Sequence, residues 1–233
     1  MWRRESMVPV QGDETTANAA LRETLRHVCW LGGGSGAGKS TIARRIAAQH
    51  RLDVYGTDDV MTDHARRTSR EDSPFLHRFM AMDIDERWVN RDPGTMVETF
   101  PWFRGEAFSL IVEDLLRLPR ETGVIVEGFR LLPHLVEPLL SSATRAVWLL
   151  PTPDFRQTVF ERRGVSSSGF LARTTDPDRA LRNLLERDRL FTDILSEEAA
   201  RLQLPAVTVT ATMTEDDLTR RVAEVFGLHS ETG

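Results

Sequence analysis

The fold of this chain is decided by the stretch GGGSGAGKST, residues 32–41. Residues 33–40 fit the pattern G-x-x-x-x-G-K-[ST], in which glycines let the backbone curl until successive N–H groups point at phosphate oxygens. In this pattern Lys39 neutralises the β- and γ-phosphates, and Ser40 offers its hydroxyl to Mg²⁺. The stretch therefore predicts a nucleoside triphosphate site, whose expected binding residues are Gly33, Gly34, Ser35, Gly36, Ala37, Gly38, Lys39, Ser40 and Thr41.

The residues on either side of the glycines support this interpretation. His27 to Leu31 has the composition of a short buried strand, and Ile42 and Ile46 recur at helical spacing after the loop. A helix beginning near Gly38 would aim its positive dipole end at the phosphates. The alternative is an ordinary glycine-rich turn between a strand and a helix, but strand, glycine loop and helix stand in the order that the phosphate site requires.

Composition limits the setting in which the protein works. A chain of 233 residues suits one α/β domain with insertions, and its single cysteine, Cys29, excludes a disulfide within the chain and favours a reducing cytoplasm. A net charge of −5 argues against general binding to nucleic acid and favours small-molecule chemistry. The sequence has no apolar run as long as a membrane span, so we expect a cytoplasmic protein without a membrane partner.

The chain is expected to fold as a flexible tail (residues 1–22) followed by a single domain (residues 23–233). Five apolar, strand-like runs alternate with helical patterns: His27 to Leu31, Leu52 to Tyr55, Val124 to Val126, Ala146 to Leu150 and Ala206 to Val209. Such alternation predicts a parallel sheet covered by helices on both faces.

A long, mostly helical insertion, about residues 60–118, separates the second and third runs and is expected to form the wall that binds a phosphate acceptor. Its aromatic residues are expected mainly to pack against one another. Its arginines favour an anionic acceptor or are solvated charges, and Arg104 is the candidate for acceptor binding. The aromatic residues are Phe75, Phe79, Trp88, Phe100, Trp102, Phe103 and Phe108, and the arginines are Arg66, Arg67, Arg70, Arg91 and Arg104.

Two acidic residues, Asp58 and Asp59, follow the second strand-like run. The carboxyl ends of parallel strands form the ligand crevice, so one of these carboxylates is expected to take the proton from an acceptor hydroxyl or to hold Mg²⁺ through water. We prefer Asp58 as the base, while Asp59 is equally able to cap a helix beginning near Val60. His64 and His77, the histidines nearest this region, are expected at the surface.

The third run ends in Glu127 and Gly128, an acid followed by a glycine at the end of an apolar strand. An acid in this position reaches the magnesium ion or its waters. The alternative is that Glu127 faces solvent or pairs with Arg130.

An arginine-rich segment, about residues 156–190, is expected to act as a lid. Guanidinium groups delivered by a closing lid stabilise the charge that spreads over a transferring phosphoryl group. The candidates are Arg162, Arg163, Arg173, Arg182 and Arg187. The alternative is a solvated helix pair in which neighbouring acids balance the arginines.

Together these features resemble the small-metabolite and nucleoside-monophosphate kinases of the phosphate-loop proteins, a group that includes shikimate, gluconate, adenylylsulfate and chloramphenicol kinases. The resemblance spans about residues 27–228. It implies a three-layer αβα fold, a five-stranded parallel sheet of order 2-3-1-4-5, ATP as donor and Mg²⁺ as cofactor. It also implies that Asp58 or Asp59 binds the acceptor, and that Arg162 and Arg187 occupy the two arms of the lid.

The expected function is therefore ATP-dependent transfer of a phosphoryl group to a hydroxyl of a small metabolite, nucleoside or antibiotic-like acceptor. The expected catalytic residues are Lys39, Asp58, Arg162 and Arg187, and the expected metal ligands are Ser40 and Glu127. The alternative is a nucleotide-hydrolysing switch, or a non-catalytic ATP-binding module, that acts through a protein partner. The absence of an N-K-x-D motif from the sequence speaks against a guanine-nucleotide switch.

Overall fold

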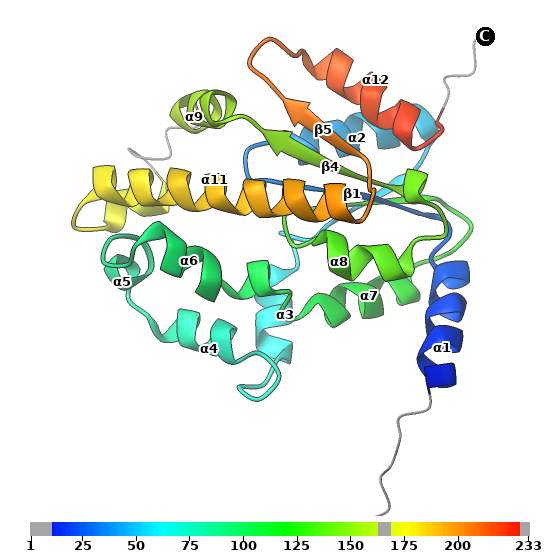
Figure 1. Cartoon of the computed structure of the whole chain (residues 1–233), viewed down its shortest axis with the longest axis horizontal. Helices are drawn as coiled ribbons and strands as arrows, with labels where there is room; N and C mark the ends of the chain where they lie inside the picture. Colours follow the sequence, from blue (N-terminus) through cyan, green and yellow to red (C-terminus); the bar gives the residue numbers. More distant parts are fainter. Residues whose placement is uncertain (1–10, 163–168, 229–233) are drawn as a thin grey trace, which may run out of the picture.

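The computed structural model describes residues 11–162 and 169–228, and it describes side chains from residue 18 onward. Five parallel strands form one sheet in the order β2-β3-β1-β4-β5 (Figure 1). The strands are β1 (Val28–Gly33), β2 (Asp53–Gly56), β3 (Val124–Glu127), β4 (Ala146–Pro151) and β5 (Ala206–Val209). The predicted α/β class, the five strands and their order are thus confirmed.

Helices connect the strands throughout the described residues. The α-helices are α1 (Gln11–Thr24), α2 (Lys39–His50), α3 (Met61–Arg67), α4 (Pro74–Ala81), α5 (Ile84–Trp88), α6 (Pro93–Thr99), α7 (Phe108–Arg117), α8 (Pro133–Val136), α9 (Pro153–Arg162), α11 (Pro177–Arg201) and α12 (Glu215–Val225). The 3-10 helices are η1 (Pro101–Arg104), η2 (Glu137–Leu139), η3 (Ala143–Arg145) and η4 (Phe170–Arg173). Among these described helices, none is both long and apolar enough to cross a bilayer.

The two faces of the sheet carry separate hydrophobic cores. On one face, Trp30 and Trp148 pack with residues of α7, α8 and α11, including Phe191. On the other face, Leu31 and Val147 pack with the apolar sides of α2 and α12. Figure 1 shows α2 and α12 on one side of the sheet and α7 and α8 on the other. Because alternate strand residues point to opposite faces, the near-continuous apolar strands contribute side chains to both cores.

Strand register brings the functional candidates to one edge of the sheet. Leu31 of β1 and Gly56 of β2 both pair with Glu127 of β3. The loop that follows each of these strands therefore leaves the sheet at the same level. This places the glycine loop (residues 33–40), Asp58 and Glu127 around a common point.

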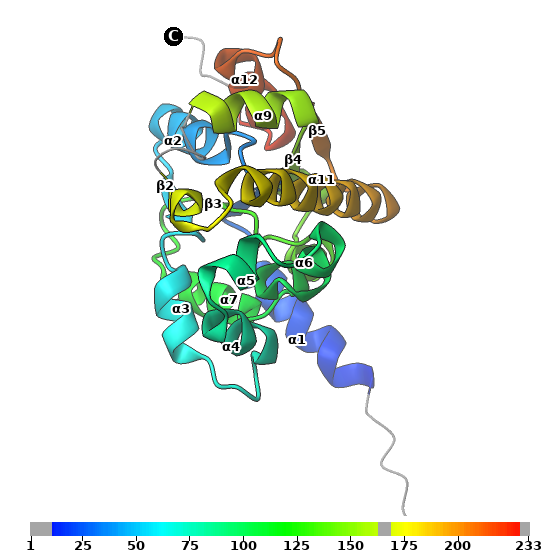
Figure 2. The ribbon, with the colours of Figure 1, turned by 90° about the vertical axis from the view of Figure 1, so that its left-hand side faces the viewer.

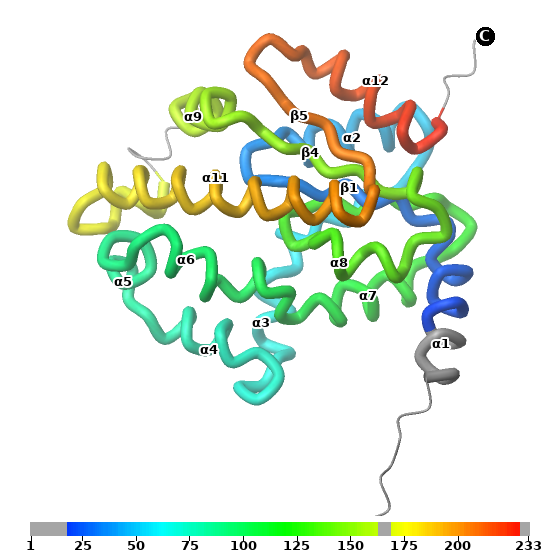
Figure 3. The backbone as a smooth tube through the Cα atoms, in the orientation of Figure 1, coloured from blue at the N-terminus to red at the C-terminus, as the bar shows by residue number. Residues whose placement is uncertain are grey.

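The insertion between β2 and β3 consists of α3 to α7 and η1, and part of it packs against the first half of α11 (Figures 2 and 3). Asn183 of α11 donates from Nδ2 to the carbonyl oxygens of Trp88 and Val89, each over 3.1 Å. The backbone N–H of Thr175 donates to Asp85 Oδ1 over 2.8 Å. These bonds hold the segment that leads into α11 against the insertion.

Residues 11–22 of the expected tail belong to α1. Leu21 packs against the core of the sheet, and Arg22 Nε donates to the carbonyl oxygen of Pro138 over 2.7 Å. These two contacts hold the end of the helix against the domain. Residues 1–10 of the expected tail lie outside the described residues.

Candidate functional site

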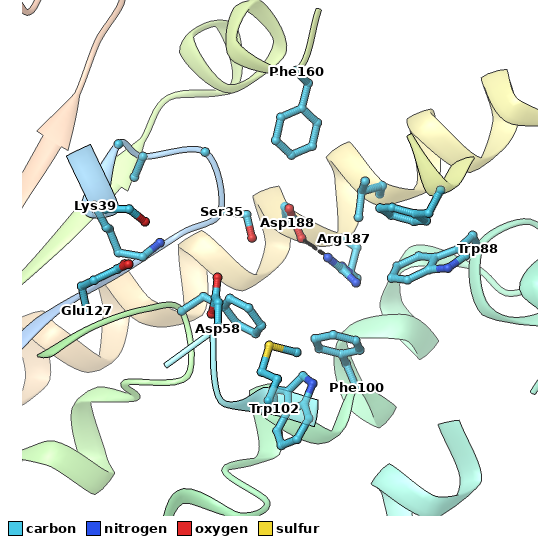
Figure 4. A pocket seen from close by; sticks show the side chains of 18 of the residues that line it. Ser35, Lys39, Asp58, Trp88, Phe100, Trp102, Glu127, Phe160, Arg187 and Asp188 are labelled. Carbon is cyan, nitrogen blue, oxygen red and sulfur yellow. Dashed lines mark hydrogen bonds and ion pairs between the residues drawn. The ribbon is translucent and has the colours of Figure 1, made fainter. Parts of the chain in front are cut away.

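A cavity of about 460 Å³ lies at the carboxyl edge of the sheet. One wall is formed by residues 35–41 together with Asp58 and Glu127, and the other by aromatic side chains of the insertion. Arg187 and Asp188 of α11 lie between the two walls (Figure 4). The cavity thus combines the glycine loop, both predicted acids and one predicted lid arginine.

The glycine loop turns back on itself through backbone conformations that favour glycine. Gly33, Gly36 and Gly38 have φ angles of 129°, 78° and 84°. No described residue accepts a hydrogen bond from the backbone N–H groups of Gly36, Gly38, Lys39 or Ser40. Because these groups lie at the start of α2, an anion beside them would meet both free donors and the positive end of the helix dipole.

The loop is fixed from behind by a buried arginine that we did not single out from the sequence. Arg156, 1% exposed, donates from Nε to the carbonyl oxygen of Ser35 over 3.3 Å and from Nη2 to Thr192 Oγ1. Gly34 is required for this approach, because a Cβ there would lie 2.7 Å from Thr192 Oγ1. Gly33 and Gly34 therefore shape the loop without lining the cavity.

Lys39 is buried at the base of the loop and donates from Nζ to the carbonyl oxygen of Gly34 over 2.8 Å. Burial lowers the pKa of its ammonium group, while the charges of Asp58, Glu127 and Asp188 oppose that shift. Lys39 is also the sole lysine of the sequence, a feature that we missed in the pattern analysis. The Lys39 ammonium group thus lies in the electrostatic field of three carboxylates, and it keeps N–H groups that are not used by Gly34.

Glu127 and Ser40 form the candidate metal-binding pair. Glu127 is 6% exposed, and burial raises the pKa of its carboxyl group, although a hydrogen bond from Ser40 and the charge of Lys39 oppose the shift. The alternatives of a solvent-facing Glu127 or a pair with Arg130 are thereby wrong. Among the described residues, no three His, Cys, Asp or Glu side chains form a metal-binding group by themselves. The two adjacent oxygens would suit a hard cation that takes its other ligands from phosphate and water.

The structure separates the two acids that follow β2. Asp58 lines the cavity, and burial raises the pKa of its carboxyl group against the opposing charges of Lys39 and Arg130. Asp59 does not line the cavity, and its Oδ2 lies over Gly56, where a Cβ would be 2.5 Å away. Neither acid caps the next helix, because the residue before α3 is Val60 and its side chain makes no capping bond. The geometry therefore favours Asp58 over Asp59 as the acceptor-binding residue.

Arg187 is the one predicted lid arginine, among the described residues, that lines the cavity. Its Nε and Nη2 donate to Asp188 Oδ1 over 2.9 and 2.6 Å, and its guanidinium lies 4.7 Å from the ring centroid of Phe100. Arg187 and Asp188 are 5% and 1% exposed, yet Arg187 Nη1 and Asp188 Oδ2 have no hydrogen-bond partner in the described part of the chain. Leaving such atoms unpaired is costly, so this pair would gain from a polar ligand.

Two further predictions are not supported by the placement of the side chains. Arg162 is exposed at the end of α9 and does not line the cavity. Arg104 is exposed on η1 and does not line the cavity either. It donates to the carbonyl oxygen of Glu98 over 2.9 Å and lies 4.1 Å from the Phe75 ring centroid. Arg163 lies outside the described residues.

A buried polar network that we did not predict supports the loop carrying Asp58. Arg130 is 2% exposed, and its Nη1 donates to the carbonyl oxygen of Thr57 over 3.1 Å. Arg130 Nη2 lies 3.0 Å from His64 Nδ1, and His64 Nε2 lies 2.8 Å from Asp114 Oδ2. Since arginine only donates, Nδ1 must accept, and the hydrogen on Nε2 then points at Asp114. His64 is thus a fully buried neutral imidazole and not a surface residue, which corrects the expectation.

Asp114 is the acceptor at the other end of this network. Burial alone would raise the pKa of its carboxyl group, but hydrogen bonds from His64, Tyr55 and Arg67 prevail and lower that pKa to about 2. Tyr55, the only tyrosine of the chain, donates to Asp114 Oδ2 over 2.8 Å. The network therefore links β2, α3 and α7 to one another, next to the loop that carries Asp58.

We expect acid to weaken the fold through His64. Burial lowers the pKa of this imidazole, so the unfolded chain takes up a proton before the folded chain does as pH falls below about 6.5. The contribution of His64 to the free energy of unfolding is therefore present above that pH and lost below it. Urea unfolding of the wild type and of His64→Gln across this range measures it, since glutamine does not titrate. A difference between the two proteins that stays constant with pH would contradict this assignment.

The described residues thus define an α/β protein with a five-stranded parallel sheet and one cavity at its carboxyl edge that joins a glycine loop to acidic and aromatic side chains. No protein-family model matches the sequence, and no curated protein matches it either. One solved structure that matches is described as an uncharacterized protein from Eubacterium ventriosum ATCC 27560. It is 14% identical, with 87% of this chain and 98% of that chain covered and a TM-score of 0.44.

Proposed function

We propose that the chain is a phosphate-loop enzyme that transfers the γ-phosphoryl group of ATP to a hydroxyl of a small molecule. The observation that carries this proposal is the shared cavity. In it, the free amides of the glycine loop and the buried ammonium group of Lys39 face Asp58 and Glu127. The aromatic-walled half next to the loop offers room for an acceptor beside the triphosphate.

The donor triphosphate would lie along the glycine loop. The N–H groups of Gly36, Gly38 and Ser40 would donate to its oxygens, and Lys39 would exchange its bond to Gly34 for one to the β- and γ-phosphates. Replacement of a carbonyl by a phosphate oxygen gives the buried ammonium group a charged partner. Lys39 thereby becomes better satisfied when nucleotide is bound than when it is not.

Magnesium fits the oxygen atoms of Ser40 and Glu127, which line the same cavity. When bound, the ion would neutralise charge on the β- and γ-phosphates. Ser40 would offer its hydroxyl to the ion, and Glu127 would hold the ion directly or through water. Burial raises the pKa of the Glu127 carboxyl group, and a cation beside it would favour the charged carboxylate.

The transfer step is a single displacement. The acceptor oxygen forms a bond to the γ-phosphorus, the bond from that phosphorus to the β,γ-bridging oxygen breaks, and ADP leaves with the electron pair. Asp58 takes the proton of the acceptor hydroxyl, for which its raised pKa makes it a stronger base than an ordinary aspartate. Arg187 Nη1 would meet a γ-phosphoryl oxygen and so gain the partner that it lacks among the described residues.

An acceptor screen that follows ADP formation tests the proposal, with Lys39→Ala as the blank. With an active acceptor, we expect Asp58→Asn to lower kcat by about 10²- to 10⁴-fold, because asparagine cannot take the proton. Asp59→Asn is the matched control, since Asp59 lies outside the cavity, and it should keep near wild-type kcat. ATP hydrolysis that no small molecule accelerates, but a protein partner does, would favour the switch instead.

A further inference from the structure

We propose that the acceptor is an uncharged alcohol that carries an aromatic ring. This inference rests on the proposed function and adds the class of molecule that receives the phosphoryl group. Three observations support it: the aromatic residues that line the half of the cavity facing the glycine loop, the positions of the arginines of the insertion, and the proposed contact of Arg187 with the phosphoryl group.

The acceptor half of the cavity has walls made of rings. They come from the insertion, from the end of β3 and from η4: Phe79, Trp88, Phe100, Trp102, Phe129 and Phe170. The rings brace one another, with Phe79 at 5.2 Å and 86° to Phe100, and Trp88 at 5.0 Å and 51° to Phe170. Edge-to-face packing of this kind holds ring faces at set angles, so a flat ligand ring would find partners already in place.

The positive charges that an anionic acceptor would need lie elsewhere. Of the insertion arginines, Arg67 pairs with Asp114 at 3.0 Å, Arg91 donates to the carbonyl oxygen of Thr95 at 3.2 Å, and Arg104 stacks on Phe75. None of these side chains lines the cavity. The placement of these three arginines therefore favours the alternative that the charges of the insertion are solvated or paired, and the wall supplies aromatic faces in their place.

Among the described residues, Arg187 is the cation between the two halves, and it is already paired. Arg187 is neutralised by Asp188 Oδ1, and its remaining donor serves the phosphoryl group in the proposed transfer. A carboxylate or phosphate on the acceptor would lose its hydration against Trp88 and Phe100 without gaining a free partner. A neutral ring, by contrast, gains from leaving water.

Isothermal titration calorimetry with three probes tests the inference on the full chain, with Mg²⁺ and a non-hydrolysable ATP analogue present. The probes are 4-nitrobenzyl alcohol, the nearly isosteric anion 4-(hydroxymethyl)benzoate, and the non-aromatic cyclohexylmethanol. We expect the nitro alcohol to bind at least about tenfold more tightly than either of the others. Tighter binding of the benzoate would overturn the claim of an uncharged acceptor, and equal binding of cyclohexylmethanol would overturn the claim of a ring.

Two variants locate the binding. Trp88→Leu should weaken binding of the nitro alcohol about tenfold, because it removes one ring face from the wall. Phe75→Leu changes a ring of the same insertion that does not line the cavity, and it should leave binding unchanged. Equal loss of binding in both variants would overturn the placement of the ring in the cavity.

The outcomes separate this inference from the function on which it rests. If ADP forms only with anionic acceptors, phosphoryl transfer stands and the inference fails. If the nitro alcohol binds at the ring wall but no alcohol in the screen produces ADP, the ligand class stands and the proposed transfer fails.

Discussion

Replacement of Lys39 by alanine is expected to lower kcat by at least about 10²- to 10³-fold while the protein remains folded. In the proposed reaction, Lys39 is the charge that meets the β- and γ-phosphates, and no other lysine exists in the chain to replace it. Arg156 cannot move into its place, because it is bound to Ser35 and Thr192 behind the loop. Initial rates of ADP formation with an active acceptor measure the effect.

The stability of the Lys39→Ala protein provides a second readout. Burial lowers the pKa of the ammonium group, which means that the folded protein carries this charge at a cost. Removing it should change the free energy of unfolding little, and the protein should keep a cooperative urea transition. Arg44→Ala, on the exposed side of α2, is the control and should alter neither rate nor stability. A Lys39→Ala protein with near wild-type kcat would remove Lys39 from the mechanism.

Because Lys39 is unique, its ammonium group can be observed directly. Selective ¹⁵N labelling of lysine gives a single Nζ resonance for the whole chain. Its titration should fall below the ordinary lysine pKa, and it should shift when ATP is added. An unchanged Nζ resonance at saturating nucleotide would contradict the placement of the phosphates.

Replacement of Gly128 by alanine is expected to destabilise the fold strongly. Gly128 has a φ of 152°, and a Cβ there would lie 1.7 Å from Thr57 Oγ1. Thr57 is completely buried, and its carbonyl oxygen is held by Arg130, so it cannot simply turn away. Overpacking costs about 1–3 kcal/mol and a strained backbone about as much again, which together predict a loss of about 2–6 kcal/mol. Urea unfolding measures this loss.

The control for this change is Gly227→Ala. Gly227 also has a positive φ, of 67°, but no atom of residues 11–162 or 169–228 is found within 4 Å of a Cβ at that position. Its cost should be the backbone term alone, about 1 kcal/mol. Adding Thr57→Ala to Gly128→Ala removes the clashing hydroxyl and should restore part of the stability. If Gly128→Ala is as mild as Gly227→Ala, the tight contact with Thr57 does not exist in solution.

The sheet and the loop could be predicted because their signals are local. Apolar runs such as Ala146 to Leu150 mark strands that are buried on both faces, and each run lies within one or two residues of the observed strand. The glycine pattern fixes its own geometry through residues adjacent in sequence. Asp58 and Glu127 could be predicted for the same reason, since each follows directly from the end of a strand.

The rest of the site depends on contacts between distant segments. Asp114 is 50 residues from His64, and Arg130 is 66 residues from it, so no spacing rule joins them. Likewise, whether Trp88 packs in the core or lines a cavity depends on how α5 packs against α11. The sequence pattern does not show this. The sequence did not show that Arg104 and Arg162 lie outside the cavity, because an exposed arginine and a phosphate-binding arginine have the same local sequence context.

Arg187 was predicted, and its pairing with Asp188, which was not, did leave a signal in the sequence. The buried face of α11 repeats at helical spacing through Leu184, Phe191 and Leu195, and Arg187 and Asp188 interrupt this apolar stripe. Charged residues are almost never fully buried without a reason, so two of them in a core-facing stripe point to a site. A search for charged residues within the apolar stripe, and not only for neighbouring charges that neutralise one another, would have favoured Arg187 over Arg162.

The course of α11 bears on how the proposed phosphoryl transfer is prepared. This helix runs unbroken for 25 residues, and its second half is embedded in the main core through Leu195 and Ala199. Arg187 is therefore carried by a helix that is anchored at its far end. In the proposed reaction, the cation that meets the phosphoryl group would already be in position when substrates arrive.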